Sequence, residues 1–471
     1  MTAKLETFVP AAPPTAAAPP APSAPPAQRE AAQREQQVRL VRWKAIEEAG
    51  GIPAWVEASL KALGLAPEHT DPSALSDKDK AAWKEKKKAE AAERRSLQRK
   101  AWEAWRATHI HHLGDGVHWH EHERPDAFDV KGREERARSN GLPELASAQS
   151  LAQALGLSVA RLRWLAYHRE VDTGTHYRTW QIPKRGGGLR TLTSPKKELK
   201  QAQRWVLSHV VERLPVHSAA HGFLTGRSIV TNALAHQGAS VVVKMDIQDF
   251  FPSVTWRRVK GLLRKGGLTE HPATLLALLA TEAPRDVVQF RGKTLYVARG
   301  PRALPQGAPT SPGLTNALCL RLDKRLSALS KRLGFTYTRY ADDLTFSFKR
   351  GRGKAPQLPP VAVLIARTAH ILEAEGFRIH PGKTRVMRTG SRQSVTGLVV
   401  NEAKGQPGAR VPREVVRQLR AALHNRERGK PGKEGETLEQ LKGMAAFIHM
   451  TDPARGRAFL ERLATLERRG T

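Results

Sequence analysis

The stretch Tyr340-Ala341-Asp342-Asp343 is flanked by two short alternating segments, Phe335-Thr336-Tyr337-Thr338-Arg339 and Leu344-Thr345-Phe346-Ser347-Phe348. Alternation with a period of two predicts two β-strands, and the residues between them predict a hairpin with paired carboxylates at its tip. Neighbouring carboxylates repel each other, and both ionise readily only when a cation lies between them. Taken alone, the tetrapeptide also fits a solvated turn, because Asp is a good turn former.

A second strand ends in another carboxylate. The apolar run Ser240-Val241-Val242-Val243-Lys244-Met245 is typical of a strand buried on both faces, and Asp246 follows it directly. An acidic residue at the end of a buried strand is costly unless it is paired or binds a metal. We therefore expect Asp246 to meet the hairpin tip at one edge of a sheet. Three carboxylates there suit two Mg²⁺ ions, which about 3.5–4 Å apart activate a 3′-oxygen and stabilise a leaving pyrophosphate.

Two further segments accompany these strands. Leu304-Pro305-Gln306-Gly307-Ala308-Pro309-Thr310-Ser311-Pro312 predicts a rigid loop that enters a helix from Gly313 to Leu333. Because Gly307 adds no side chain, such a loop can approach a base pair closely, although an ordinary loop before a helix fits as well. A second helix is predicted from Val254 to about Arg264, with Ser253 as its N-cap.

Upstream, the segment from Trp180 to Thr193 predicts a hairpin with the basic tip Lys184-Arg185-Gly186-Gly187-Gly188. A basic flap suits a triphosphate, since Lys acts as a point charge and Arg as a bidentate fork. Without the other motifs, a solvent-exposed hairpin would explain the same residues.

The composition limits the classes of protein. The 471 residues carry 78 Lys+Arg against 45 Asp+Glu, a formal charge of +33. That excess predicts a polyanionic partner, most simply nucleic acid, although a basic proteome would also produce it. One cysteine, Cys319, excludes an intramolecular disulfide framework and any multi-cysteine metal site. With no secretion signal and no apolar run of membrane-spanning length, we expect a cytoplasmic protein without a membrane partner.

The N-terminal third is organised differently. A Pro/Ala-rich start predicts a disordered tail over 1–36, and tryptophans among charged residues predict a basic helical extension over 37–144. Within that extension, 77–106 fits either a solvated helix with ion pairs along its length or a helix that binds RNA along a basic face. Six histidines follow within 109–122, where contacts at the surface or to RNA are favoured over a metal site: His109, His111, His112, His118, His120 and His122.

In their order along the chain, these motifs resemble the reverse transcriptase family, and specifically bacterial retron reverse transcriptases. The resemblance covers about 151–401 and implies a mixed α/β, right-hand polymerase fold, with fingers and palm over 145–401 and a basic helical thumb over 402–471. It implies that Asp246, Asp342 and Asp343 are the catalytic, Mg²⁺-binding residues. The nucleotide-binding residues that it implies are Lys184, Arg190, Phe251 as the gate against a ribose 2′-hydroxyl, Gln306 and Lys383, the last of which lies close to the departing phosphates.

Two segments resemble retron enzymes in particular. One holds His221-Gly222-Phe223, Arg227, Asn232-Ala233 and His236, and the other is Val395-Thr396-Gly397-Leu398-Val399-Val400-Asn401. The resemblance makes Arg227, Asn232, His236 and Gly307 candidates for binding the RNA template, although Asn232 and His236 also fit a satisfied pair within a helix. The long N-terminal extension resembles that of the larger, myxobacterial-type enzymes.

The resemblance implies RNA-templated DNA synthesis from dNTPs with two Mg²⁺ ions. The template and primer would be a structured noncoding RNA, primed from the 2′-hydroxyl of a guanosine, and the RNA-linked DNA product would serve antiphage defence with a separate effector protein. Three alternatives remain open: a group II intron-type or diversity-generating reverse transcriptase, a noncatalytic RNA-binding scaffold on a polymerase fold, and a DNA-templated polymerase. The short region after Asn401 and the intact Gln306-Gly307 argue against the first.

Overall fold

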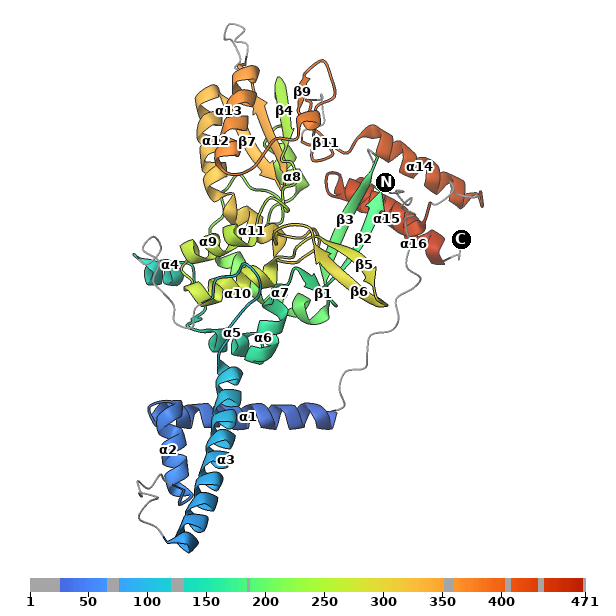
Figure 1. Ribbon diagram of the computed structural model, residues 1–471. Helices are drawn as coiled ribbons and strands as arrows, with labels where there is room; N and C mark the ends of the chain where they lie inside the picture. Colours follow the sequence, from blue (N-terminus) through green and yellow to red (C-terminus); the bar gives the residue numbers. More distant parts are fainter. Residues whose placement is uncertain are drawn as a thin grey trace, which may run out of the picture. The chain divides into compact units, whose positions relative to one another are not determined.

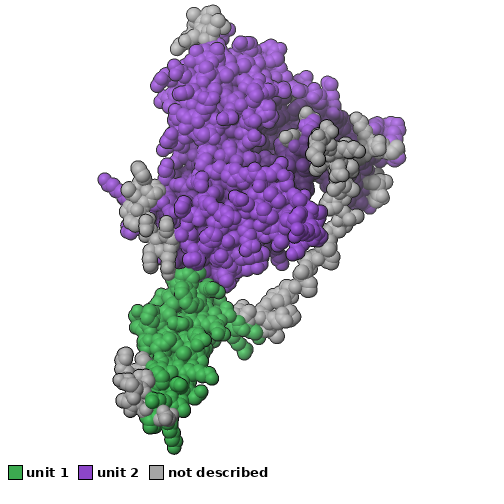
Figure 2. Space-filling model, viewed as in Figure 1, with its two compact units in different colours: residues 1–109 green, residues 110–471 purple. Residues whose placement is uncertain are grey.

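The computed structural model describes residues 26–65, 76–119, 131–183, 187–350, 359–402, 408–430 and 436–468. The chain forms two compact units, residues 1–109 and residues 110–471 (Figure 2). Each unit is described by itself below.

The first unit is helical in its described part. Helices α1 (Pro26–Glu48) and α2 (Ile52–Ala62) pack against the long helix α3 (Asp77–Thr108), as Figure 1 shows. Small apolar clusters join them, with Ile46 against Ala101 and Ala104, and Val56 and Leu60 against Leu97. Residues 26–36, which we expected to belong to the tail, are helical, which corrects that boundary. Proline is tolerated at the first helical position, and the residues after Pro26 are mostly strong helix formers.

The second unit is a mixed α/β body, as expected. Its helices before the thumb region are α4 (Arg133–Ser139), α5 (Ala148–Ala154), α6 (Val159–Ala166), α7 (Lys197–His209), α8 (Ile229–Leu234), α9 (Trp256–Gly266), α10 (Glu270–Ala280), α11 (Ser311–Leu318), α12 (Leu320–Leu333) and α13 (Val361–Ala374). Its strands are β1 (Val171–Asp172), β2 (Tyr177–Pro183), β3 (Leu189–Pro195), β4 (Val241–Asp246), β5 (Arg285–Phe290), β6 (Lys293–Ala298), β7 (Phe335–Tyr340), β8 (Asp343–Phe348), β9 (Arg385–Arg388), β10 (Ser394–Val395) and β11 (Leu398–Val399).

A four-stranded antiparallel sheet of order β7-β8-β4-β9 lies at the centre of this unit. Because side chains alternate across a strand, β4 turns Val241, Val243 and Met245 to the main apolar core. The opposite face of β4 carries Val242, Lys244 and Asp246, the last at its end. The prediction of a buried strand that ends in a carboxylate is confirmed.

Smaller sheets surround the central one. Strands β2 and β3 form a hairpin, β1, β6 and β5 form a three-stranded sheet, and β10 and β11 form a short hairpin. Among the described ranges, no helix is both long enough and apolar enough to cross a membrane.

Two helix predictions need correction. Helix α9 begins two residues later than expected, with Thr255 as its N-cap, and the Ser253 hydroxyl donates to the Phe250 carbonyl instead. The helix predicted from Gly313 to Leu333 is two helices, α11 and α12, which are divided at Cys319. The second one ends at Gly334 in the left-handed conformation (φ 75°), as Gly at that position predicts.

The C-terminal region holds α14 (Arg413–Glu427), α15 (Leu438–His449) and α16 (Pro453–Arg468). These helices share a second apolar core with residues far upstream in the chain. That core joins Leu419, Leu423 and Leu441 to Ala233 of α8 and to Val242 of β4. The strand that carries Asp246 therefore packs between the two cores of this unit.

Candidate active site

The central sheet brings the three predicted aspartates to one end. Asp246 and Asp343 are register partners on adjacent strands, and Asp342 lies in the two-residue turn between β7 and β8. The Ile247 amide donates to the Asp342 carbonyl at 3.0 Å, which ties the end of β4 to this turn. Ala341 takes a positive φ of 55° to close the turn. The predicted hairpin and its meeting with the end of β4 are both confirmed.

Lysines balance two of the carboxylates. Lys383 Nζ lies 2.8 Å from an oxygen of Asp246, and Lys244 Nζ lies 3.4 Å from an oxygen of Asp343. Burial, together with the charges of Asp246 and Asp343, raises the pKa of Asp342 to about 6. In the region that the structure describes, no ion pair involves Asp342. Burial and the two neighbouring carboxylates therefore disfavour the ionised form of Asp342.

The described residues contain no group of three or more His, Cys, Asp or Glu side chains placed to hold a metal ion together. Asp343 turns to Lys244, while Asp246 and Asp342 line one cavity. Mg²⁺ commonly takes only one or two protein carboxylates and completes its octahedron with water and substrate phosphates. The donor set of Asp246 and Asp342 fits that pattern, and Asp343 lies beside them at the start of β8, next to Lys244.

The cavity has a volume of about 540 Å³ and opens between the central sheet, the β2–β3 hairpin and the loop before α11. Six of its lining residues are ones that the sequence predicts for this site: Arg190, Asp246, Phe251, Gln306, Asp342 and Lys383. His380 and Arg299 also line it, and no sequence pattern pointed to them. Lys184 lies outside the described residues, so its prediction stands as it was.

The Gln306-Gly307 loop is fixed to the hairpin. The Thr193 amide donates to the Gln306 carbonyl at 2.7 Å, and Gly307 has a φ of 124°. A Cβ at Gly307 would lie 3.0 Å from the Thr193 carbonyl oxygen. In this structure glycine is required by the close approach to β3, whereas we expected an approach to a base pair.

A buried polar cluster supports the turn between β7 and β8. The Arg339 guanidinium, with no exposed surface, pairs with Asp323 at 2.7 Å and donates to the Ala341 carbonyl at 3.2 Å. It also donates to Asn316, whose amide donates to the Gly222 carbonyl. A buried, fully bonded ion pair of this kind holds one geometry, because each partner is costly to leave alone. Sequence reasoning missed Asp323, which lies among ordinary charges of an amphipathic helix.

Gly222, from the first retron-like segment, contacts the same turn. A Cβ there would lie 2.8 Å from the Ala341 nitrogen, and the His221 amide donates to the Arg339 carbonyl at 2.8 Å. The segment therefore borders the catalytic hairpin directly. Further along, the Arg227 side chain is exposed, so it remains available to an RNA.

Asn232 and His236 need correction as RNA-binding candidates, because both are fully buried. His236 contacts Ser347 and Thr338 of the central sheet at 2.7 and 2.6 Å, and Thr338 donates to Asn232 at 2.6 Å. Burial, with smaller effects of nearby positive groups, lowers the pKa of His236 to about 3. These side chains fix α8 to the sheet. Asn232 and His236 therefore take part in the buried hydrogen bonding that was the alternative to RNA binding.

The second retron-like segment meets the first. Thr396 and Gly397 form the turn between β10 and β11, and the Thr396 hydroxyl donates to the Ile229 carbonyl at the start of α8. The two segments, far apart in sequence, therefore form one joint beside the central sheet.

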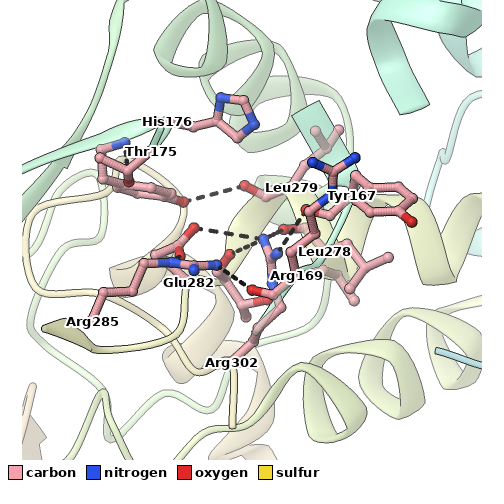
Figure 3. Close-up of polar contacts among 12 residues, drawn as sticks. Tyr167, Arg169, Thr175, His176, Leu278, Leu279, Glu282, Arg285 and Arg302 are labelled. Carbon is pink, nitrogen blue, oxygen red and sulfur yellow. Dashed lines mark hydrogen bonds and ion pairs between the residues drawn. The ribbon is translucent and has the colours of Figure 1, made fainter. Parts of the chain in front are cut away.

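Figure 3 shows a second cluster of charged side chains, in which Glu282 and Arg302 are buried. Arg302 is 3% exposed and donates to the carbonyls of Leu278 and Thr281 at the end of α10. Glu282 pairs with Arg285 at 2.8 Å and lies 3.9 Å from Arg302. This cluster anchors residues 299–306 on α10, and so supports the wall of the cavity.

The histidine-rich segment shows no metal site among its described members. His109 stacks on Trp105, and His112 contacts Tyr167. His120 and His122 lie outside the described residues.

The chain is similar in sequence to known proteins. The reverse transcriptase (RNA-dependent DNA polymerase) family matches residues 182–414, which places the catalytic sheet and the cavity within a reverse transcriptase domain. The chain is 70% identical to the retron Mx162 reverse transcriptase of Myxococcus xanthus, over 99% of this chain and 98% of that one. It is 45% identical to the retron Mx65 reverse transcriptase of the same organism, over 70% of this chain and 74% of that one. A telomerase structure from Candida albicans covers 60% of this chain and 56% of its own, with 10% identity and a TM-score of 0.33.

The fold and the site thus define an RNA-directed DNA polymerase of the right-hand class. The chain belongs to the retron reverse transcriptase family.

Proposed function

We propose that this reverse transcriptase copies part of a structured noncoding RNA into single-stranded DNA that stays linked to the RNA. Priming comes from the 2′-hydroxyl of a guanosine in that RNA, and the product serves antiphage defence with a separate effector protein. The observation that carries the proposal is the 70% identity to a retron reverse transcriptase over nearly the whole chain. The joint between the two retron-like segments, held by Thr396 and Ile229, supports it further.

The catalytic proposal assigns Asp246 and Asp342 to hold Mg²⁺ together with the nucleotide phosphates, with Asp343 as the third aspartate of the site. When bound, divalent cations activate the attacking hydroxyl and neutralise charge on the leaving pyrophosphate. Lys383, 2.8 Å from Asp246, keeps that carboxylate compensated when the nucleotide is absent. Because its pKa is raised, the carboxyl group of Asp342 is one whose ionised form a bound cation would stabilise.

The remaining cavity residues position the nucleotide in this proposal. Arg190 is exposed at the start of β3 and lines the cavity, where its guanidinium suits a triphosphate. Lys184 is proposed to assist it. Phe251 is half-buried in the cavity wall, which suits exclusion of a ribose 2′-hydroxyl. Gln306 also lines the cavity, and Gly307 allows the close approach of its loop to β3.

The same proposal divides the chain into fingers and palm over 145–401, a thumb over 402–471 and an N-terminal extension over 37–144. A cavity of about 810 Å³ beside α14 supports a nucleic-acid role for the thumb. Six arginines line it, and guanidinium groups suit the phosphates of a template–product duplex: Arg392, Arg410, Arg413, Arg417, Arg420 and Arg455. We also propose a cytoplasmic location, because the one cysteine is buried and offers no disulfide.

The test has two parts. Nucleic acid that co-purifies with the enzyme is sequenced, and we expect an RNA–DNA branched species; ordinary cellular RNA without attached DNA contradicts the retron role. Primer extension on RNA with dNTPs and Mg²⁺ then compares the wild type with Asp342→Asn. The exposed Asp115→Asn is the matched control. We expect DNA synthesis to be lost only with Asp342→Asn, whereas RNA binding without synthesis by the wild type would favour a scaffold.

A further inference from the structure

The outer face of α3 carries an exposed basic stripe, with a gap between Lys88 and Arg95. At 100° per residue, five cationic side chains and one tryptophan fall within about 60° of one another around the helix. All six are exposed, and Trp102 is 51% exposed: Lys84, Lys88, Arg95, Arg99, Trp102 and Arg106. We call this set the α3 stripe.

The stripe lies nearly opposite the face that α3 uses for folding. Leu97, Ala101 and Ala104 are buried against α1 and α2, and they point away from the stripe by their position around the helix. The acidic residues Glu90 and Glu93 lie on the inner side, where they pair with other cations. Within the ranges that the structure describes, none of the five cations of the stripe makes an ion pair. Folding of this unit therefore does not account for the stripe.

The dimensions of the stripe fit an extended polyanion. From Lys84 to Arg106 it runs about 33 Å at 1.5 Å per residue. At the spacing of double-stranded DNA, one phosphate charge per about 1.7 Å of axis, on the order of 20 phosphates surround that length of a duplex. Membrane insertion needs a broad apolar face, whereas Trp102 is the one apolar side chain among these six.

We propose that the α3 stripe binds the sugar–phosphate backbone of double-helical RNA, as a second contact outside the polymerase cavity. This inference rests on the proposed function in one respect, because a stem of the structured noncoding RNA would be its natural ligand. Lys and Arg contacts to phosphate position an RNA without reading its sequence. The stripe would thus hold the folded part of the RNA while another part is copied.

The test uses the full chain and a blunt 20-base-pair RNA duplex, with binding measured between 50 and 300 mM salt. One variant changes the five cations of the stripe to Gln, a good helix former. The control variant changes five exposed lysines of the same unit that lie off the stripe to Gln: Lys44, Lys61, Lys78, Lys86 and Lys100. Both variants lose five positive charges. The control also breaks the exposed Lys44–Glu48 and Lys100–Glu93 pairs, which contribute little to stability.

Loss of up to five phosphate contacts should lower the slope of log affinity against log salt by about four. Affinity near 150 mM salt should fall by about 10²–10³-fold in the stripe variant, with a much smaller change in the control. A third variant that exchanges Lys for Arg and Arg for Lys at the five positions should restore binding. Equal losses in stripe and control variants, or no loss, would overturn the proposal. The proposal would also be overturned if the stripe variant kept its affinity for the RNA duplex but lost its binding to vesicles of anionic lipid.

Primer extension on a short unstructured RNA template is run in parallel. A wild type that binds the duplex through the stripe but makes no DNA would contradict the proposed function alone. If the wild type makes DNA, but the wild type and the stripe variant bind the duplex with equal affinity, this inference alone would be contradicted.

Discussion

The buried His236 network makes a quantitative prediction about stability in acid. Thr338 has one hydroxyl proton, which it donates to Asn232, so it must accept from His236 Nε2. His236 Nδ1 then accepts from Ser347, and the imidazole is neutral. A proton on Nδ1 would place a charge in a fully buried site and displace the Ser347 hydrogen bond, which agrees with a pKa of about 3.

The direction of the pH effect on the unfolding free energy follows from the linkage between protonation and folding. The folded protein leaves His236 neutral, whereas the unfolded chain takes up the proton near pH 6.5, so stability is complete above pH 6.5 and falls as the pH drops toward 3. At pH 5 the loss from this one group is about 2 kcal/mol, at 1.36 kcal/mol per pH unit. His236→Gln should be less stable than the wild type at pH 8, by about 1–3 kcal/mol, because it breaks buried hydrogen bonds.

The assay is urea-induced unfolding of the full-length wild type and His236→Gln at pH 8, 6 and 5, followed by tryptophan fluorescence. We expect the gap in unfolding free energy to shrink by about 2 kcal/mol from pH 8 to pH 5. His221, whose pKa burial lowers to about 4, is present in both proteins and largely cancels from the comparison. Parallel pH dependence of the two proteins would refute the reasoning and reopen a direct contact between His236 and RNA.

Three other predictions concern the cavity and its supports. Gly307→Ala should slow DNA synthesis and destabilise the protein by more than about 1 kcal/mol, because its Cβ meets β3 at a positive φ; the unhindered Gly300→Ala is the control, and equal rates and urea midpoints would contradict the argument. Phe251→Ala should lower the preference for dNTPs over rNTPs in kcat/KM by at least about tenfold, since a missing side chain opens the wall of the cavity; an unchanged ratio would remove Phe251 from that role. Arg302→Met should lower the unfolding free energy by about 3 kcal/mol in urea, because buried carbonyls lose their donor; the exposed Arg299→Met should differ little from the wild type, and equal effects would argue against the buried cluster.

The catalytic strands were predictable because their signals are local. An apolar run that ends in Asp246, and a hairpin alternation around Asp342, each follow from period-two patterning within a dozen residues. We expected the two strands to meet because a buried carboxylate is costly unless it is paired or binds a metal. The cavity-lining positions of Arg190 and Phe251 followed from the family resemblance.

What the sequence did not predict depends on contacts between distant segments. Asp323 and Arg339 look like ordinary charges until the fold buries both. Lys244 offered a signal, since a lysine inside an apolar strand needs a partner, but the pattern alone does not identify that partner as Asp343. Ser253 does not cap the helix, because its hydroxyl donates to the Phe250 carbonyl instead. That hydrogen bond depends on how the chain turns before α9, which the local sequence does not determine.

The second apolar core has a consequence for engineering. Leu419, Leu423 and Leu441 of the C-terminal helices interlock with Ala233 and Val242, so a chimera cut at residue 402 would pair one parent's C-terminal helices with the other parent's α8 and β4. Mismatched side-chain volumes in a packed core commonly cost 1–3 kcal/mol each, so such a hybrid should express poorly. A transplant that moves 229–242 and 394–468 together would keep the whole interlocked set from one parent. An exchange of the C-terminal helices between relatives therefore has to move two separate segments at once.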